Sequence, residues 1–254
     1  MITPLKYTPT TTKSLAQLKT KVPAGTVIDS YLLFSGDMEL LLAENDYFVC
    51  AHTNKYVVYE FWYTLMEDHK RIYDIIACDD FHFVEPQYEI LQEKWAHYKD
   101  PYIRSALFFM LNRLSETGEI SSGKLTPGDY NKYALANLAG FYVPENFYLM
   151  YDKNDDFVDS IKPSELSEVV LIRAGDFKYN LFEEGISRGD ETVIFNHRKL
   201  KEKLDSLDKK KVIIYNYHPY LLALYKDYDI DMINKYGKVT KNKGDCVELF
   251  ISKL

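Results

Sequence analysis

The sequence predicts an α/β fold, in which a mainly parallel sheet is interrupted by a helical insertion. Apolar, β-rich runs occur in residues 1–54 and return in residues 142–254, whereas residues 55–141 carry helical patterns without clear strands. The chain has 254 residues, 46% of them hydrophobic and 27% charged, so it can bury a sizeable core. We therefore expect one α/β domain made of the two outer segments, with the middle segment inserted as a helical unit.

The first outer segment alternates strand, helix and strand. Residues 26–34 are β-rich and end at Ser35-Gly36-Asp37, where a turn into a helix is expected. Residues 38–42 indicate that helix, and residues 47–51 indicate a second strand, followed by His52-Thr53-Asn54. A strand, a helix and a strand in such close succession predict a right-handed parallel unit.

The inserted segment has three helical patterns, and strands return after Pro144. The helices are expected around Val57, Phe61, Leu65 and Ile72, then over 88–98 and over 103–114, with a polar loop or short hairpin after the third. The later strands are expected over 168–173, 191–195, 212–216 and 246–251, with a connecting helix over 200–207.

Composition limits the classes of function. The net charge of −7 weighs against a surface built throughout to hold DNA, because phosphate contacts dominate such binding. Residues 198–211 and 235–243 are nevertheless basic, and each is either a solvated surface or a local basic patch. No apolar run reaches the roughly 20 residues of a membrane helix. The N-terminus also has no apolar signal core, so a cytoplasmic protein is expected.

Residues 103–113, with the sequence IRSALFFMLNR, carry the most specific motif of the chain. They are similar to the segment R-A-A-L-F-L-Y-L-N-R of the Dam-like class of adenine-specific (N6) DNA methyltransferases. Further agreements follow along the chain. Residues 5–7 agree with L-K-W, residues 31–43 with the first cofactor loop E-P-F-x-G-A-G, and residues 47–54 with the strand ending A-D-I-N. Residues 192–199 agree with the strand and loop of D-P-P-Y, and residues 246–253 with the closing strand. The chain thus resembles this family over nearly its whole length.

The resemblance implies a Rossmann-like, S-adenosylmethionine-dependent methyltransferase fold with a helical insertion that recognises DNA. In that family the cofactor binds at the carboxyl ends of the strands, and the target adenine is flipped out of the duplex because its amine cannot be reached inside the stack. Phages often carry such genes, so a phage or other viral origin suits the family. The fold does not by itself imply methyl transfer.

The family positions for the cofactor are degenerate in this chain. They fall on Tyr7, Phe34, Ser35, Gly36, Asp37 and His52. Glycines let the backbone approach the ligand, but two of their positions hold Ser35 and Asp37, and Asp37 would repel the methionine carboxylate. His52 replaces the acid that binds the ribose hydroxyls, and a neutral imidazole offers one acceptor where a carboxylate offers two oxygens.

The catalytic tetrad is also replaced. Its four positions fall on Asn196, His197, Arg198 and Lys199. Asn196 can still accept a hydrogen bond from an amine, but His197 and Arg198 stand where the family has two prolines. Lys199 removes the aromatic ring that stacks on the flipped base, a contact worth roughly 1–3 kcal/mol. The joint loss of these elements favours a protein in which methyl transfer is no longer selected.

Residues for DNA contact are better retained. An arginine and an asparagine at a helix end beside a polar loop suit contacts with phosphates and base edges, although, taken alone, such a segment is more often simply an amphipathic helix with its exit loop. The candidates are Arg104, Asn112, Arg113, Lys238, Lys241 and Lys243.

The sequence therefore predicts a catalytically inactive homologue, a pseudo-enzyme, that acts by binding duplex DNA or a protein partner. Two alternatives stay open: an active adenine DNA methyltransferase with a divergent pocket, and a structural or assembly protein. No cofactor is expected unless the enzyme alternative holds, in which case it is S-adenosylmethionine. No metal is expected either, because the six histidines lack i, i+4 pairing and the three cysteines lack metal-site spacing.

Overall fold

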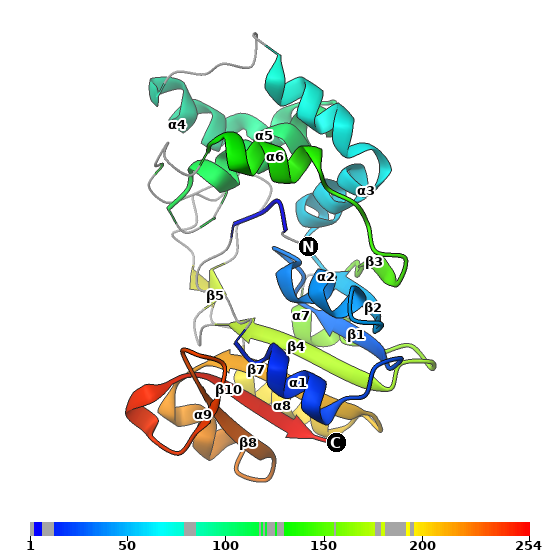
Figure 1. Ribbon diagram of the computed structural model, residues 1–254, viewed down its shortest axis with the longest axis vertical. Coiled ribbons are helices and arrows are strands. Elements are labelled where there is room, and N and C mark those ends of the chain that lie inside the picture. The colour runs from blue at the N-terminus through cyan, green and yellow to red at the C-terminus, as the bar shows by residue number, and fades with distance from the viewer. Residues whose placement is uncertain are drawn as a thin grey trace.

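The computed structural model describes residues 3–6, 13–78, 85–116, 118, 120, 125, 130–154, 156–175, 179–180, 192–193 and 196–254. Its centre is an eight-stranded sheet, drawn in the lower half of Figure 1, with a group of helices above it. In sheet order the strands are β3 (Phe147–Tyr151), β2 (Phe48–Thr53), β1 (Val27–Tyr31), β4 (Val169–Gly175), β7 (Lys210–Asn216), β10 (Cys246–Lys253), β8 (Asp229–Asn234) and β9 (Val239–Thr240).

The strand order identifies the fold. Strands β3, β2, β1, β4 and β7 are parallel, and the order reverses between β1 and β4, as in nucleotide-binding sheets. Strand β10 is antiparallel to both of its neighbours, β7 and β8. A parallel sheet with an antiparallel strand, here β10, inserted between its last two parallel strands is the Rossmann-like methyltransferase fold, so the predicted fold class is confirmed.

One expected strand does not join this sheet. The structure places β6 (Thr192–Val193) in a separate two-stranded sheet with β5 (Tyr179–Asn180), antiparallel to it. The prediction of a main-sheet strand over 191–195 was therefore wrong for its described residues. A two-residue pairing is too short to be distinguished in the sequence from the start of a buried strand.

Helices pack on both faces of the sheet. They are α1 (Leu15–Lys21), α2 (Asp37–Ala43), α3 (Tyr56–Ala77), α4 (Glu85–Lys94), α5 (Pro101–Leu114), α6 (Lys132–Ala139), α7 (Phe157–Ser160), α8 (His197–Asp205) and α9 (Pro219–Leu224), with short 3-10 turns η2 (Trp95–His97) and η4 (Lys243–Asp245). Helix α5 begins sharply, because Asp100 accepts hydrogen bonds from two amides of its first turn and Pro101 has its fixed φ there.

The core has two parts, one on each face of the sheet. Strand β4 is buried at every position, and its side chains alternate between the parts: Val169 and Leu171 face the first, Val170 and Ile172 the second. The first part joins α1, α2 and α3 to α5 and α6, so the helical segment shares a continuous core with the sheet. The second part lies under α7, α8 and α9.

The start of the chain is anchored to both regions. The side chain of Asn112, at the end of α5, accepts from the Lys6 amide at 2.6 Å and donates to the Lys6 carbonyl at 2.7 Å. The buried Glu248 carboxylate of β10 accepts from the Ser14 amide at 2.8 Å and from its hydroxyl at 2.7 Å. Within the described part of the chain, no helix has the length and apolar character needed to cross a membrane.

Candidate functional site

The strand order fixes where a ligand would bind. At the point between β1 and β4 where the order reverses, the connections leave to opposite faces of the sheet, and a crevice forms outside the carboxyl ends of the strands. Three groups of side chains lie there: the loop 33–37 after β1, His52 near the end of β2, and Arg173 near the end of β4. This is the edge at which the predicted cofactor positions meet, apart from Tyr7, which lies outside the described residues.

The retained glycine of the first loop is in contact with a tryptophan. Gly36 has a φ of +66° and precedes α2, so a glycine is favoured by its backbone alone. A Cβ at Gly36 would lie 2.5 Å from the ring of Trp62, a fully buried residue of α3. The indole Nε1 also donates to the Phe34 carbonyl at 2.8 Å. The space that the glycine leaves is therefore taken by the protein's own side chain.

The acid of that loop is held by a buried arginine. The Arg173 guanidinium, with 6% of its side chain exposed, contacts Asp37 and Glu39 at 2.8 Å each. Burial raises the pKa of Asp37, but the Arg173 charge and a 2.8 Å hydrogen bond from the Ser35 hydroxyl outweigh it and lower that pKa overall. Glu39 also accepts from the Ser30 hydroxyl at 2.9 Å. The network links β1, α2 and β4 across the point where the strand order reverses.

His52 is held between two carboxylates. Its Nδ1 lies 3.2 Å from Asp152, its Nε2 forms an ion pair of 3.6 Å with Asp29, and its ring stacks on Tyr31 with a 4.4 Å separation of the ring centres. Burial lowers the pKa of His52, yet the two carboxylates raise it overall to about 9. Burial likewise raises the pKa of Asp29, but His52 and the Ser164 amide lower it overall. His52 is thus an imidazolium at neutral pH.

These residues do not fit S-adenosylmethionine. The approach to Gly36 is occupied by Trp62, and the carboxylate of Asp37 is neutralised within the protein by Arg173. The position predicted for the ribose-binding acid holds His52, whose two ring nitrogens face carboxylates of the chain, Nδ1 at 3.2 Å from Asp152 and Nε2 at 3.6 Å from Asp29. Among the described residues, no group of three or more His, Cys, Asp or Glu side chains could hold a metal ion.

The predicted catalytic positions lie at the start of α8. Asn196 is the N-cap of this helix, and its side chain accepts from the amides of Arg198 and Lys199 at 3.1 and 3.0 Å. The His197 Nδ1 lies 2.8 Å from the Tyr215 hydroxyl, and the side chain of His197 is buried. Asn196 and His197 therefore both make structural contacts. The strand beside β1, which is β4, carries Arg173 near its end, and the tetrad lies elsewhere, at the start of α8.

The charged ends of the other two tetrad side chains also have partners. The Arg198 Nε donates to the Tyr220 hydroxyl at 3.2 Å, and Lys199 forms ion pairs with Asp156 at 2.5 Å and Asp159 at 2.9 Å. Lys199 thereby joins α8 to α7 on the surface.

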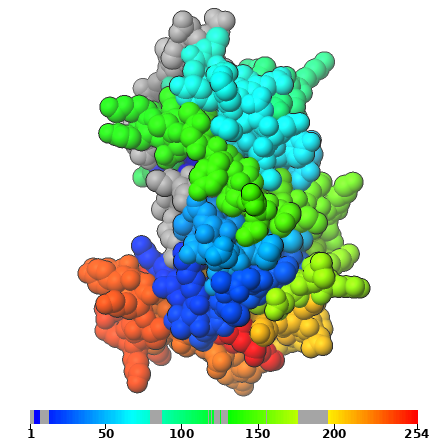
Figure 2. Space-filling model, turned by 45° about the vertical axis from the view of Figure 1, so that its right-hand side comes forward, coloured from blue at the N-terminus to red at the C-terminus, as the bar shows by residue number. Residues whose placement is uncertain are grey.

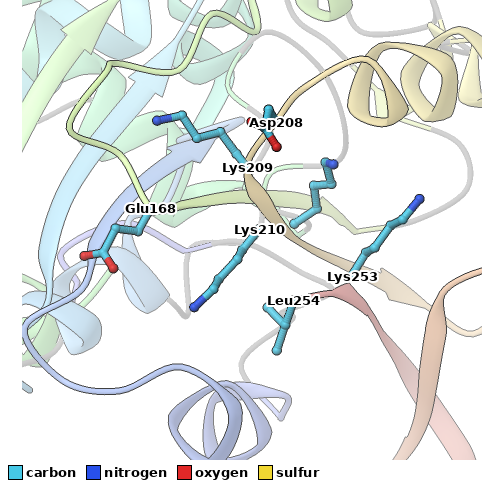
Figure 3. Close-up of a pocket in the computed structure, with 7 residues that line it drawn as sticks. Glu168, Asp208, Lys209, Lys210, Lys253 and Leu254 are labelled. Atoms are coloured by element: carbon cyan, nitrogen blue, oxygen red, sulfur yellow. The ribbon is translucent and has the colours of Figure 1, made fainter.

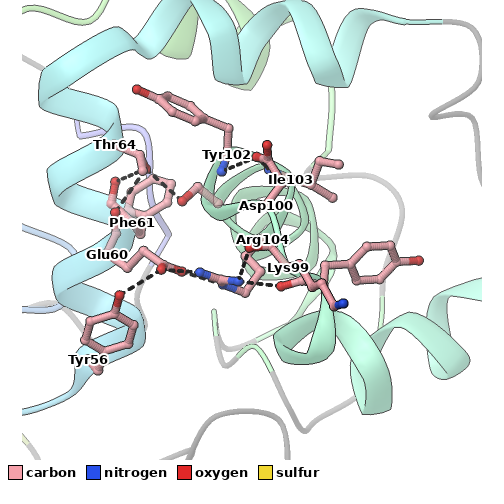
Figure 4. A network of polar contacts seen from close by, with 11 residues as sticks. Tyr56, Glu60, Phe61, Thr64, Lys99, Asp100, Tyr102, Ile103 and Arg104 are labelled. Carbon is pink, nitrogen blue, oxygen red and sulfur yellow. Dashed lines mark hydrogen bonds and ion pairs between the residues drawn. The ribbon is translucent and has the colours of Figure 1, made fainter.

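The candidates for DNA contact fall into two groups. In the helical segment, Arg104 donates from Nε to Glu60 of α3 at 2.6 Å and from its terminal nitrogens to Glu60 and to the carbonyls of Tyr98 and Lys99, as Figure 4 shows. Asn112 is fully buried. Both side chains therefore hold the protein together in this structure, and Arg113 beside them is partly buried.

The second group is exposed. Lys238 and Lys241 flank β9, and Lys243 begins η4; none of the three forms an ion pair with the residues that the structure describes. Strand β8 runs in the same direction as β7, so the hairpin that follows it begins at the carboxyl edge of the sheet. The structure thus brings these lysines to the edge that carries the cofactor positions, and separates them from Arg104 and Asn112.

A second basic cluster lies at the opposite edge. Glu168, Asp208, Lys209, Lys210, Lys211, Lys253 and Leu254 line a hollow of about 510 Å³ at the amino ends of β4 and β7. Figure 3 shows that Lys209, Lys210 and Lys253 point away from one another rather than toward a common centre. The Lys209 ammonium donates to the carbonyls of Glu165 and Ser167. The arrangement lacks the convergent charges of an anion site.

Sequence reasoning missed the residues that fill the site. Arg173 carried a signal, because it is a charged side chain at the end of an otherwise apolar run expected to be a buried strand. Asp29, an acid within the expected strand 26–34, and Glu39, an acid in an apolar helix, carried the same kind of signal. Trp62 and Asp152 carried no such signal, because only the folded chain brings them to Gly36 and His52.

Comparison with known proteins adds little sequence evidence. No protein-family model matches the chain, and no curated protein sequence matches it. Among solved structures, it is similar to the crystal structure of a predicted O-methyltransferase, protein Atu636 from Agrobacterium tumefaciens. That similarity has a TM-score of 0.38 and 10% identity, and covers 96% of this chain and 79% of the other. The strand order, and not this likeness, is what places the chain in the methyltransferase fold class.

Proposed function

We propose that this protein is a methyltransferase-fold pseudo-enzyme that does not bind S-adenosylmethionine and acts by binding duplex DNA. The proposal that the protein does not bind S-adenosylmethionine rests on the occupied cofactor site, where Trp62 covers Gly36 and Arg173 neutralises Asp37. A cofactor would have to displace a fully buried tryptophan and break a buried ion pair, and breaking such a pair costs about 3–5 kcal/mol.

Exposed lysines support DNA as the partner. Lys238, Lys241 and Lys243 lie on a segment, residues 235–243, that contains no acid, although the chain as a whole carries a net charge of −7. Phosphates attract such a cluster locally, and the acidic remainder of the surface limits binding elsewhere. We therefore expect weak binding with little sequence preference, because these lysines are suited to phosphates rather than to base edges.

Two assays on the full chain test the proposal together. A gel shift with duplex DNA at low salt should show retardation that falls as salt rises. Incubation of the same DNA with labelled S-adenosylmethionine should transfer no methyl group. Absence of retardation at low salt contradicts DNA as the partner and leaves a protein partner. Methylated adenine in the product contradicts the pseudo-enzyme assignment and supports an active enzyme with a divergent pocket.

A further inference from the structure

Among the strands that the structure describes, β3 forms the first edge of the sheet and pairs only with β2. The Asn146 carbonyl accepts from the Val49 amide at 2.8 Å, and the Asp152 amide donates to the Thr53 carbonyl at 3.0 Å. Because peptide groups alternate in direction along a strand, Leu149 directs its amide and carbonyl away from β2, toward the outside of the sheet. Figure 1 shows β3 next to β2, at the end of the sheet nearest the helical segment.

This edge lacks the features by which proteins protect exposed strands. The sequence of β3, FYLMY, contains no charge and no proline. Tyr148 and Met150 project on its open face with 48% and 44% exposure, beside Phe48 of β2 with 40%. Figure 2 brings this side forward and shows the green segment around β3 at the surface. The opposite edge offers less backbone to pair with, because β9 has only two residues.

The residues around β3 are complementary to a second copy of themselves. If two β3 strands pair antiparallel about Leu149, then Leu149 faces Leu149, and Tyr148 faces Met150 of the other copy. In the same register Glu145 faces Lys153, once on each side of the two-fold axis. Glu145 and Lys153 are both exposed, and neither forms an ion pair with the described residues of its own chain.

Only this register gives that charge pairing. A shift by two residues, the smallest that keeps the outward amides paired, places Glu145 opposite Tyr151 or opposite residue 155 instead. In the centred register the two Leu149 residues exchange both of their backbone hydrogen bonds. Tyr148 and Met150 then form the closer, non-hydrogen-bonded pair, in which an aromatic ring and a thioether make a favourable contact.

We propose that the protein forms a two-fold symmetric dimer by antiparallel pairing of β3 with β3 of a second copy. The two eight-stranded sheets then continue into one another, and the same surface serves on both subunits. The occupant is a second copy rather than an unrelated strand because the edge carries its own complementary charges, Glu145 and Lys153. This inference is independent of DNA binding and of the state of the cofactor site.

Sedimentation equilibrium on the full chain tests the dimer, and charge exchange tests its register. The wild-type protein should have twice the monomer mass. Glu145→Lys and Lys153→Glu should each weaken dimerisation by about tenfold, because each places like charges opposite one another at two positions. The double variant E145K/K153E should restore it, because the pairs re-form with reversed signs.

Matched controls separate the edge from general charge and folding effects. Glu116→Lys makes the same charge change at an exposed site far from β3 in the sequence and should leave the mass unchanged. Tyr148→Lys should give a monomer whose far-ultraviolet circular dichroism is that of the wild type, since Tyr148 is an exposed side chain. If the wild-type protein is a monomer at every concentration, the proposal is overturned, and any partner of β3 must be a strand of a different protein. A dimer unaffected by all edge variants overturns it as well.

Discussion

The ring of Trp62 lies directly against the α-carbon of Gly36, so that a Cβ at this glycine would be 2.5 Å from the indole. In the family that the sequence resembles, a glycine at this turn lets the backbone approach a cofactor. Here the same residue lets the backbone approach a side chain of α3, whose Nε1 donates to the neighbouring Phe34 carbonyl. A retained glycine is thus explained by internal packing, without a ligand.

Substitution at Gly36 measures this contact. Gly36→Ala should lower the free energy of unfolding by about 2–4 kcal/mol, because the methyl group meets the Trp62 ring at a left-handed backbone position. Gly25→Ala is the matched control, since Gly25 also has a positive φ, of +84°, but no atom within 4 Å of the added Cβ. It should cost about 1–2 kcal/mol. The free energies of unfolding of both variants can be measured in urea. Equal losses of unfolding free energy in the two variants would show that Trp62 does not confine Gly36.

The ion pairs of Arg173 should be strongly stabilising as a unit. Arg173→Met leaves the buried carboxylates of Asp37 and Glu39 without a counter-charge, so it should cost about 3–5 kcal/mol in urea unfolding. Adding Asp37→Asn and Glu39→Gln to that variant should recover most of the loss, because the uncompensated charges are then removed.

An exposed pair provides the comparison for Arg173. Arg71→Met breaks the surface ion pair with Asp100, which is 3.4 Å long, and should cost at most about 1 kcal/mol. If Arg173→Met lowers the free energy of unfolding by no more than Arg71→Met does, the buried network contributes little to stability.

The sequence predicted the sheet better than it predicted the site. Apolar runs such as 168–173 and 212–216 identify buried parallel strands, because both faces of such strands are covered, and β4 and β7 are found there. Strand β3 was not predicted, because its burial alternates and its pattern FYLMY is too short to separate strand from helix. The site depends on contacts between Trp62 and Gly36 and between Asp152 and His52, which no periodicity encodes.

Stability should depend on pH through His52. Its pKa is raised from 6.5 to about 9 in the folded chain, so its contribution is fully present below pH 6.5 and is lost as the pH rises to 9. The shift corresponds to a loss on the order of 3 kcal/mol across that interval. Unfolding measured at pH 6.5 and pH 9 should show a decline in the wild type that is absent in His52→Gln. The same decline in both proteins would contradict a charged His52.

Binding to DNA should weaken when the lysines around β9 are removed. Replacing Lys238, Lys241 and Lys243 by alanine should reduce the slope of log affinity against log salt by about three, since each phosphate contact contributes nearly one. The variant K162A/K210A/K226A removes the same charge from exposed lysines elsewhere and should keep the wild-type slope. Equal slopes for the two triple variants would place any DNA contact outside residues 235–243.

Calorimetric titration of the purified protein with S-adenosylmethionine tests the central claim most directly. Because Trp62 and Arg173 occupy the site from within, the titration should give no saturable heat, and the cofactor should not raise the melting temperature. Saturable binding at micromolar cofactor would contradict the account, and would mean that the protein opens this packing to admit a methyl donor.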